Sequence, residues 1–356
     1  MAPNSPSPFV EIPGCAAQEP GQRLAGPVAR FGRFLRALGR PAPKGSLALA
    51  DALPWLVPKV RPRFVYETFT MRTGRPAPVF RPLAGALAVS LVVDLPNQDL
   101  DVGPAELDAW QVDFDRLMQT ARSNLLARGG DRAFQSLGHG RYRSSWRDSL
   151  DGSRMLLPGL LKRLPLQGDP VVLVPNRNTL LVVGADDLPG LRWALECTSR
   201  DMNEDLAAVE GSPLRLRNYH WEAFRAGEDH PLGALLGRIE QLRLKNDYAQ
   251  QKALLDECHR WRGAAVTVAP YHLETLPAGA VSSFTVWSHA AQEVWLPEAD
   301  RINLAWAPGA PQGRPWVSWQ AAQQRLCHLL EPVGLFPERY RFRALPQADQ
   351  LERLLA

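Results

Sequence analysis

Hydrophobic residues recur along the chain at two spacings, and these spacings predict where strands and helices lie. Residues 86–95 are mostly apolar and include several β-branched valines, which predicts a strand. Residues 113–127 place apolar side chains three and four positions apart, which predicts a helix with one buried face. Two apolar runs within 171–183 flank a polar turn and predict a β-hairpin, with Asn176 and Arg177 at its exposed tip. Because both faces of these runs are apolar, the hairpin is expected in the interior of a sheet.

The second half of the chain shows further patterns of both kinds. Helical spacing covers 188–207, where Asp186 or Asp187 precedes the first turn and is suited to cap it. A longer helical pattern covers 232–262 and contains no proline after Pro231. The other predicted strands are 213–217, 264–268, 281–287, 301–306 and 339–342, and another helix is predicted over 317–330.

These elements predict an α+β fold in four parts. Residues 1–83 are a basic, proline-rich leader that is expected to be partly disordered. Residues 84–230 form a central domain of mixed sheet and helices, and residues 231–262 form a helical connector. Residues 263–356 form a smaller, β-rich C-terminal unit. This last part is rich in tryptophan, because six of the eleven Trp residues lie between positions 261 and 319.

The composition is that of a folded chain without a membrane span. The 356 residues are 45% hydrophobic and 22% charged, which is ordinary for a globular protein with a core. The longest apolar run, 86–93, is far shorter than the roughly 18–20 residues that cross a bilayer. The first residues lack the charged and apolar segments of a signal peptide, so a cytoplasmic location is expected.

Charge is distributed unevenly along the chain. Residues 1–83 hold twelve Arg or Lys and four Asp or Glu, whereas the remainder is mildly acidic. Such a basic arm can bind nucleic acid through phosphate contacts. It can also be a solvated leader that touches the acidic body of its own chain. We favour the second interpretation because the arm has no dense run of Lys or Arg.

The familiar catalytic and metal-binding motifs are missing from the sequence. The four cysteines are far apart and form no Cys-x-x-Cys pair. No Lys ends a glycine-rich nucleotide-binding loop, and no Gly-x-Ser-x-Gly motif is present. We therefore expect neither a metal nor a cofactor, and the sequence leaves open whether the protein is an enzyme.

Two polar segments border apolar elements and form the candidate ligand site. One precedes an apolar run at a predicted helix start, and the other is the turn of the predicted hairpin. The candidate residues are Asp148, Asp151, Ser153, Arg154, Asn176, Arg177 and Asn178. If the two segments face one cleft, they could hold a small anionic ligand. The alternative, which we favour, is a capped helix start whose arginines pair with its acids.

The same segments carry a resemblance to a known family. They are Asp-Ser-Leu-Asp-Gly-Ser-Arg at 148–154 and Pro-Asn-Arg-Asn at 175–178, preceded by 121–125 and followed by Ser212-Pro213 and Trp221. In this order and spacing, residues 85–230 resemble the bacterial YtpQ-like proteins, a family of unknown function. The resemblance implies a cytosolic bacterial α+β domain and transfers no catalytic residue.

Three classes of function follow. A non-catalytic binding or adaptor protein comes first, because no catalytic constellation is recognised; its partner would be an unidentified protein or a small anionic ligand. An enzyme that acts on a small anionic substrate near 148–154 comes second, and a nucleic-acid binder that uses the basic leader comes third. A pocket of convergent polar groups would favour the enzyme, and an apolar patch with exposed Trp would favour the binding protein. The sequence indicates neither a substrate nor an oligomeric state.

Overall fold

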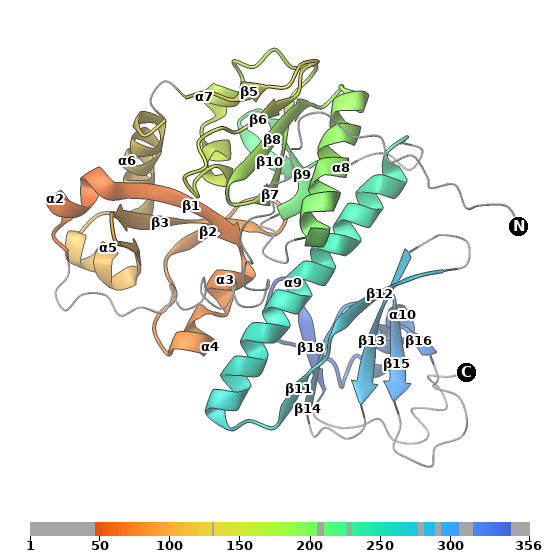
Figure 1. Cartoon of the computed structure of the whole chain (residues 1–356). Helices are drawn as coiled ribbons and strands as arrows, with labels where there is room; N and C mark the ends of the chain where they lie inside the picture. Colours follow the sequence, from red (N-terminus) through yellow and green to blue (C-terminus); the bar gives the residue numbers. More distant parts are fainter. Residues whose placement is uncertain are drawn as a thin grey trace, which may run out of the picture.

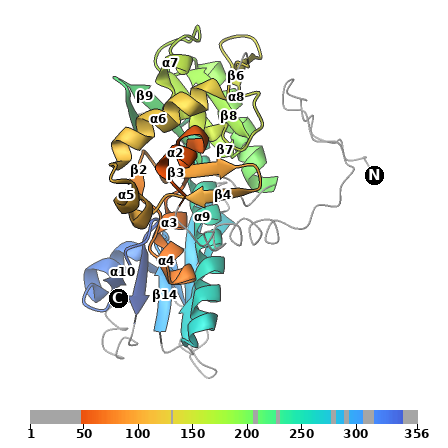
Figure 2. The same ribbon diagram turned by 90° about the vertical axis from the view of Figure 1, so that its left-hand side faces the viewer.

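The computed structural model describes residues 47–129, 132–204, 210–225, 230–276, 281–288, 293–305 and 316–342. Over these residues the chain is an α+β protein with two lobes that are joined by one long helix, α9 (Figures 1 and 2). The N-terminal lobe, within 47–225, contains two sheets. The C-terminal lobe, within 266–342, contains two smaller sheets. The predicted fold class is thus confirmed.

The first sheet of the N-terminal lobe is built on the strand predicted over 86–95. This strand, β3 (Leu87–Leu95), pairs antiparallel with β1 (Leu56–Pro62) on one side. On its other side β3 pairs with β2 (Phe80–Pro82) and with β4 (Gln98–Asp101), which follows it through a short turn. The short helices before and between these strands are α2 (Leu49–Ala52), η1 (Leu53–Trp55), α3 (Phe64–Glu67) and α4 (Phe69–Thr73).

Strand β1 lies inside the segment that the sequence assigned to the leader. It pairs with β3 along its whole length, and six of its seven residues are buried. Pro58 and Pro62 suggested a broken chain, but β1 is an edge strand, where proline leaves no ladder hydrogen bond unmade. Residues 47–83 therefore belong to the folded lobe. The leader prediction for residues 1–46 lies outside the described residues.

The second sheet contains the predicted hairpin at its centre. Strands β7 (Pro170–Asn176) and β8 (Thr179–Gly184) pair antiparallel, and every residue from Val171 to Leu173 and from Leu180 to Val183 is buried. The spatial order of the sheet is β10-β9-β7-β8-β6-β5. Its outer strands are β5 (Gln135–Ser136), β6 (Tyr142–Arg143), β9 (Glu210–Arg217) and β10 (His220–Ala223). The predicted hairpin, its interior position and the strand over 213–217 are confirmed. The exposed tip is Arg177 and Asn178, because Asn176 is still paired in β7 and is half-buried.

Two predicted helices cover these sheets. Helix α6 (Phe114–Ala127) begins at Asp113, whose carboxylate accepts a hydrogen bond from the amide of Arg116. Helix α8 (Leu188–Glu204) begins after Asp187, whose Oδ1 accepts from the amide of Gly190 at 2.9 Å. The remaining helices of the lobe are α5 (Pro104–Trp110), η2 (Gly152–Leu156) and α7 (Pro158–Leu161). Both long helices and the cap at Asp187 agree with the sequence predictions, whereas the cap at Asp113 was not predicted.

Each face of the central sheet is covered by apolar side chains from other elements. On one face, Val172, Leu180 and Val182 pack in a shared core with side chains of β1, β3 and α6. On the other face, the opposite side chains of β7 and β8 pack against α8 and the start of α9. This double coverage explains why both faces of the hairpin are apolar in the sequence.

Helix α9 (Gly233–Arg262) is the predicted connector, and it ends at Gly263, which adopts the left-handed conformation with φ of 63°. Its side chains contact both lobes. Leu254 packs with Phe64 and Phe69 of the N-terminal lobe, and Leu255 packs with Trp295 of the C-terminal lobe. The helix also buries polar side chains, namely Arg243, Asn246, Asp247, Gln250, Gln251 and His259.

The C-terminal lobe consists of two four-stranded sheets and one helix. The first sheet has the order β11-β14-β18-β17 and the second the order β12-β13-β15-β16. Their strands are β11 (Val266–Val268), β12 (Tyr271–Thr275), β13 (Val281–Ser288), β14 (Glu293–Pro297), β15 (Arg301–Ala305), β16 (Trp316–Ser318), β17 (Glu331–Pro332) and β18 (Arg339–Phe342); the helix is α10 (Trp319–Leu326). All four strands predicted here and the helix are present, whereas β12, β14, β16 and β17 were not predicted.

A buried arginine joins α9 to this lobe. Arg339 of β18 is fully buried, and its guanidinium donates to carbonyl or amide oxygens of Gln251, Ala269, Trp295 and Tyr248. Burial lowers the pKa of Arg339 to about 10. Gln251 also donates to the carbonyl of Pro337 at 2.9 Å, so one amide side chain satisfies two buried groups.

We predict that Gln251→Leu lowers the free energy of unfolding by about 3 kcal/mol, because it leaves a buried guanidinium N–H and a carbonyl without partners. Lys245→Leu, at an exposed position of the same helix, is the control and should change stability by about 0.5 kcal/mol at most. Urea denaturation of both variants measures the difference. If Gln251→Leu is as stable as Lys245→Leu, the Gln251 contacts do not hold the C-terminal lobe to α9.

Candidate functional site

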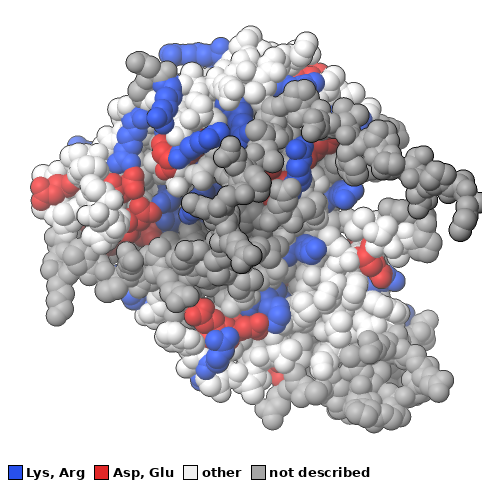
Figure 3. Space-filling model, viewed as in Figure 1, with Lys and Arg blue, Asp and Glu red and all other residues white. Residues whose placement is uncertain are grey.

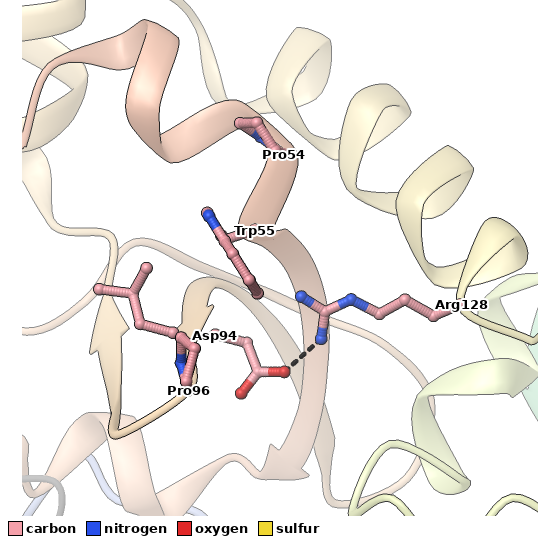
Figure 4. Close-up of a pocket in the computed structure, with 6 residues that line it drawn as sticks. Pro54, Trp55, Asp94, Pro96 and Arg128 are labelled. Carbon is pink, nitrogen blue, oxygen red and sulfur yellow. Dashed lines mark hydrogen bonds and ion pairs between the residues drawn. The ribbon is translucent and has the colours of Figure 1, made fainter.

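The described surface contains an open hollow beside the end of strand β3. It has a volume of about 540 Å³ and is lined by Pro54, Trp55, Asp94, Leu95, Pro96 and Arg128 (Figure 4). The lining comes from η1, from the turn between β3 and β4, and from the residue that caps the C-terminus of α6. Three separate parts of the first sheet and its helix thus meet at one place.

Trp55 is the main apolar side chain of this hollow. It ends the 3-10 turn η1, which contains Pro54, and 40% of its surface is exposed. The chain enters β1 directly after Trp55, so the indole is fixed by a rigid turn on one side and by a paired strand on the other. Pro96 follows β3 and adds a second rigid ring to the lining.

The charged side chains of the hollow pair with each other. Arg128 forms an ion pair with the carboxylate of Asp94 (Figure 4). As the residue that follows α6, Arg128 also lies where the helix dipole favours positive charge. Burial, and then the hydrogen bond with the neighbouring carboxyl of Asp99, raises the pKa of Asp94 above its ordinary value.

A row of ion pairs continues from Asp94 across the sheet. Asp99 faces Asp94 across the β3–β4 pair and forms an ion pair with Lys59 of β1. Burial alone would raise the pKa of Asp99, but the positive charge of Lys59 holds it below its ordinary value. Next along the strands, Arg61 is bonded to Asp101 at 2.6 Å. Burial lowers the pKa of Lys59, and the nearby charge of Arg61 lowers it further.

The structure brings the two predicted polar segments together at one point. The amide of Ser149 donates to the side-chain oxygen of Asn178 at 3.1 Å. Asn176 accepts from the amide of Asn178 and lies 3.4 Å from Asp201, while Arg177 is exposed at the tip of the turn. The segments therefore touch through backbone and amide groups.

Arg154 lies beneath this contact and is only 1% exposed. Two of its nitrogens donate to the two carboxylate oxygens of Asp148 at 2.8 and 2.6 Å, and its guanidinium carbon lies 4.3 Å from the ring centre of Trp146. Burial alone would raise the pKa of Asp148, but the hydrogen bonds and charge of Arg154 hold it below its ordinary value. The geometry is that of a buried structural pair.

Asp151 and Ser153 are also buried beneath the surface. The hydroxyl of Ser153 accepts from the amide of Val60 at 3.0 Å, which ties η2 to strand β1. One carboxylate oxygen of Asp151 accepts from the amide of Asp148, and the other has no hydrogen-bond partner. The predicted helix start is the short 3-10 turn η2, and no side chain caps it. The tight turn η2 takes the place of the capped helix that the polar pattern suggested.

The described residues contain no group of three or more His, Cys, Asp and Glu side chains that could hold a metal ion. Within the same residues, no helix combines the length and apolarity needed to cross a membrane. What the hollow offers chemically is an exposed indole, two proline rings and a carboxylate–guanidinium pair. These groups suit binding by stacking and hydrogen bonding.

Comparison with known proteins adds no relative: no family model, curated protein or solved structure matches the chain. The resemblance of residues 85–230 to the YtpQ-like proteins therefore stays a prediction.

The sequence analysis missed the residues of the hollow and the ion pairs behind it. Trp55, Lys59 and Arg61 were placed in the leader, and Asp94 was seen only as the end of a strand. A signal was present: Lys59 and Arg61 alternate with apolar residues, and so do Asp99 and Asp101. Complementary charges at a spacing of two on separate segments are typical of neighbouring strands.

We predict that Arg154→Ala lowers the free energy of unfolding by about 3 kcal/mol, because it removes a buried ion pair and leaves a cavity beside Trp146. Arg177→Ala, at the exposed tip of the hairpin, should change stability by about 0.5 kcal/mol at most. Chemical denaturation of the two variants is the measurement. If Arg154→Ala leaves the free energy of unfolding unchanged, the structural role of Arg154 is contradicted.

A second prediction concerns the stability of the fold at acidic pH. Because the pKa of Asp148 is lower in the folded chain than the value of 3.8 in an unfolded one, its carboxylate stabilises the fold above that value. This contribution is lost as the pH falls through the lowered pKa. Asp148→Asn should therefore be less stable than wild type at neutral pH, and the difference should shrink below about pH 4.

Urea denaturation across this pH range measures the effect. Asp108→Asn, which removes one charge from an exposed position, serves as the control. A stability difference for Asp148→Asn that grows in acid would refute the assignment.

Proposed function

We propose that the protein is a non-catalytic binding or adaptor protein and that the Trp55 hollow holds part of its partner. The supporting observation is an indole that is 40% exposed in an open hollow, beside acidic and basic groups that already pair with each other. An enzyme site needs an acid, base or nucleophile available to the substrate. Asp94 and Arg128 are instead engaged with one another, while the aromatic surface is open.

The chemistry of the lining favours an extended, proline-containing protein segment as the partner. Such segments dock on surfaces made by aromatic and proline rings, because their rigid form loses little entropy on binding. Trp55 lies between Pro54 and Pro96 in the lining of the open hollow (Figure 4). The Asp94–Arg128 pair at its edge supplies both an acceptor and donors for the peptide backbone.

The enzyme alternative, with a small anionic substrate near 148–154, receives less support from the geometry. Its central cation, Arg154, is buried and binds both carboxylate oxygens of Asp148. An anionic ligand would have to displace that carboxylate. Arg177 is exposed at the tip of the hairpin and forms no described contact with Arg154.

The nucleic-acid alternative depends on the basic character of residues 1–83. In the described part of that segment, Lys59, Arg61 and Arg63 form ion pairs with Asp99, Asp101 and Glu67. Such pairs leave less charge for phosphate groups. Arg75 and Arg81 are exposed, with the guanidinium of Arg81 4.9 Å from the ring centre of Phe114, and the basic residues of 1–46 lie outside the described residues. Membership of the YtpQ-like family, bacterial origin and a cytoplasmic location remain proposals that rest on the sequence.

The proposal predicts that a fluorescently labelled decaproline peptide binds the full chain and that Trp55→Ala weakens binding at least about tenfold, because stacking on the indole is lost. Fluorescence anisotropy gives the dissociation constants. Trp316→Ala, which removes an exposed Trp from the other lobe, is the matched control and should bind as wild type does.

Equal binding by wild type and Trp55→Ala, or no binding by wild type, would reject the proposal. Unfolding curves of both variants show whether they are folded. Neither substitution removes a buried side chain, so both variants should unfold close to the wild-type midpoint.

A further inference from the structure

The C-terminal segment is rich in tryptophan, and none of these tryptophans lines the Trp55 hollow. Trp287 and Trp319 fill the core of the C-terminal lobe and are 4% and 5% exposed. Trp316, at the start of β16, is 44% exposed and is not part of that core. Neighbouring positions along β16 alternate between exposed and buried, so Trp316 lies on the outer face of the β12-β13-β15-β16 sheet.

Aromatic and cationic side chains are placed next to each other on this outer face. In the strand register, His272 of β12 faces Phe284 of β13, which in turn faces Arg301 of β15. The rings of His272 and Phe284 are stacked with centroids 4.8 Å apart. Trp316 meets Phe284 edge to face at 5.4 Å, and the guanidinium of Arg301 lies 4.8 Å from the Trp316 ring centre.

Unsatisfied polar atoms lie beside the exposed indole. Asn303 is the register partner of Trp316 and is only 4% exposed, and its side-chain oxygen has no hydrogen-bond partner among the described residues. The Nε of Arg301 also lacks an acceptor. Buried polar groups without partners are rare in folded proteins, because each one costs free energy. These two atoms are buried under the ring, so the polar groups that a ligand can reach beside Trp316 are those of the Arg301–Glu274 ion pair.

The charges of this face exclude a polyanion as its ligand. Arg301 forms an ion pair with Glu274 of β12. Burial, and then the charge of Lys245 on α9, lowers the pKa of His272, so its imidazole is neutral at pH 7. Asp300, at the end of the sheet, accepts from the amide of Ser283 and adds negative charge. In Figure 3 the visible surface of this lobe carries mostly uncharged side chains. A nucleic acid would find little unpaired positive charge here.

We propose that the outer face of the β12-β13-β15-β16 sheet binds a neutral carbohydrate chain. The apolar C–H face of a sugar ring packs on the indole of Trp316, as other apolar rings do on aromatic side chains. Its hydroxyl groups both donate and accept, which matches the Arg301–Glu274 ion pair beside the indole, whose side chains are 32% and 35% exposed. Four strands span about 14 Å across the sheet, which suits an extended chain better than a single enclosed molecule.

Retention of the full chain on insoluble cellulose, chitin, xylan and starch tests this inference. Wild type should be retained by at least one of these polymers. Trp316→Ala should lower the affinity at least about tenfold, whereas Trp316→Phe should keep most of it. Trp261→Ala, which removes an indole that is 79% exposed and belongs to neither proposed surface, is the matched control and should be retained as wild type is. Retention should persist when the salt concentration is raised severalfold, because no ion pairs with the ligand are involved.

Four outcomes would overturn the inference. The first two are that wild type is retained on none of the four polymers, or that Trp316→Ala is retained as well as wild type. The other two are salt-sensitive binding of poly(U) that depends on Trp316, and a concentration-dependent dimer that Trp316→Ala abolishes. The last two would assign the face to single-stranded nucleic acid and to a second copy of the chain. Because the decaproline experiment uses Trp55, a failure here is distinguishable from a failure of the proposed function.

Discussion

The buried guanidinium of Arg339 fixes how the long helix and the C-terminal lobe fit together. Among the described residues its hydrogen-bond acceptors include no carboxylate, and its donors are directed to oxygens from α9, from β14 and from the segment between β11 and β12. A charged group without a counterion is costly to bury, so these acceptors must stay in place once the lobe has folded. Tyr248 adds to this arrangement, because its hydroxyl donates to the carbonyl of Glu338 and accepts from the amide of Glu298.

The loop before Arg339 extends this constraint to the N-terminal lobe. Glu338 accepts hydrogen bonds from the amides of Val333 and Gly334, which holds the loop in one shape. The amide of Phe336 in the same loop donates to Glu67 of α3 at 2.6 Å. Since α9 also packs against α3 and α4, the two lobes are held together by polar contacts as well as by apolar packing.

Both binding surfaces that we propose are aromatic side chains left exposed next to charges that are already paired. In the hollow, Trp55 lies beside Asp94 and Arg128; on the outer sheet face, Trp316 lies beside Arg301 and Glu274. Because the charges are paired, neither surface has the net positive charge that would attract a polyanion. Binding then depends on stacking against the ring and on neutral hydrogen bonds. The two surfaces lie on different lobes, which is the arrangement expected of an adaptor.

The sequence by itself determined the elements whose pattern is local. The hairpin over 171–183 and helices α6, α8 and α9 could be predicted because apolar spacing, caps and breakers act within a few residues of each other. The contact between the two polar segments was posed as a possibility, and the structure shows that it runs through Ser149 and Asn178.

Only the tertiary structure decided which charges are paired and which rings are exposed. Pro58 and Pro62 pointed to a leader, yet β3 supplies a partner that makes β1 an edge strand. Arg154 became part of a buried pair, and Trp55, which lies in the same segment as β1, became the open ring of the hollow. The ion pairs of the first sheet depend on distant partners, such as Asp99 for Lys59, 40 residues apart, whereas Arg154 and Asp148 are six residues apart. Local spacing can show that two segments carry complementary charges, but it does not determine which segments pair, because it is the folded sheet that places them side by side.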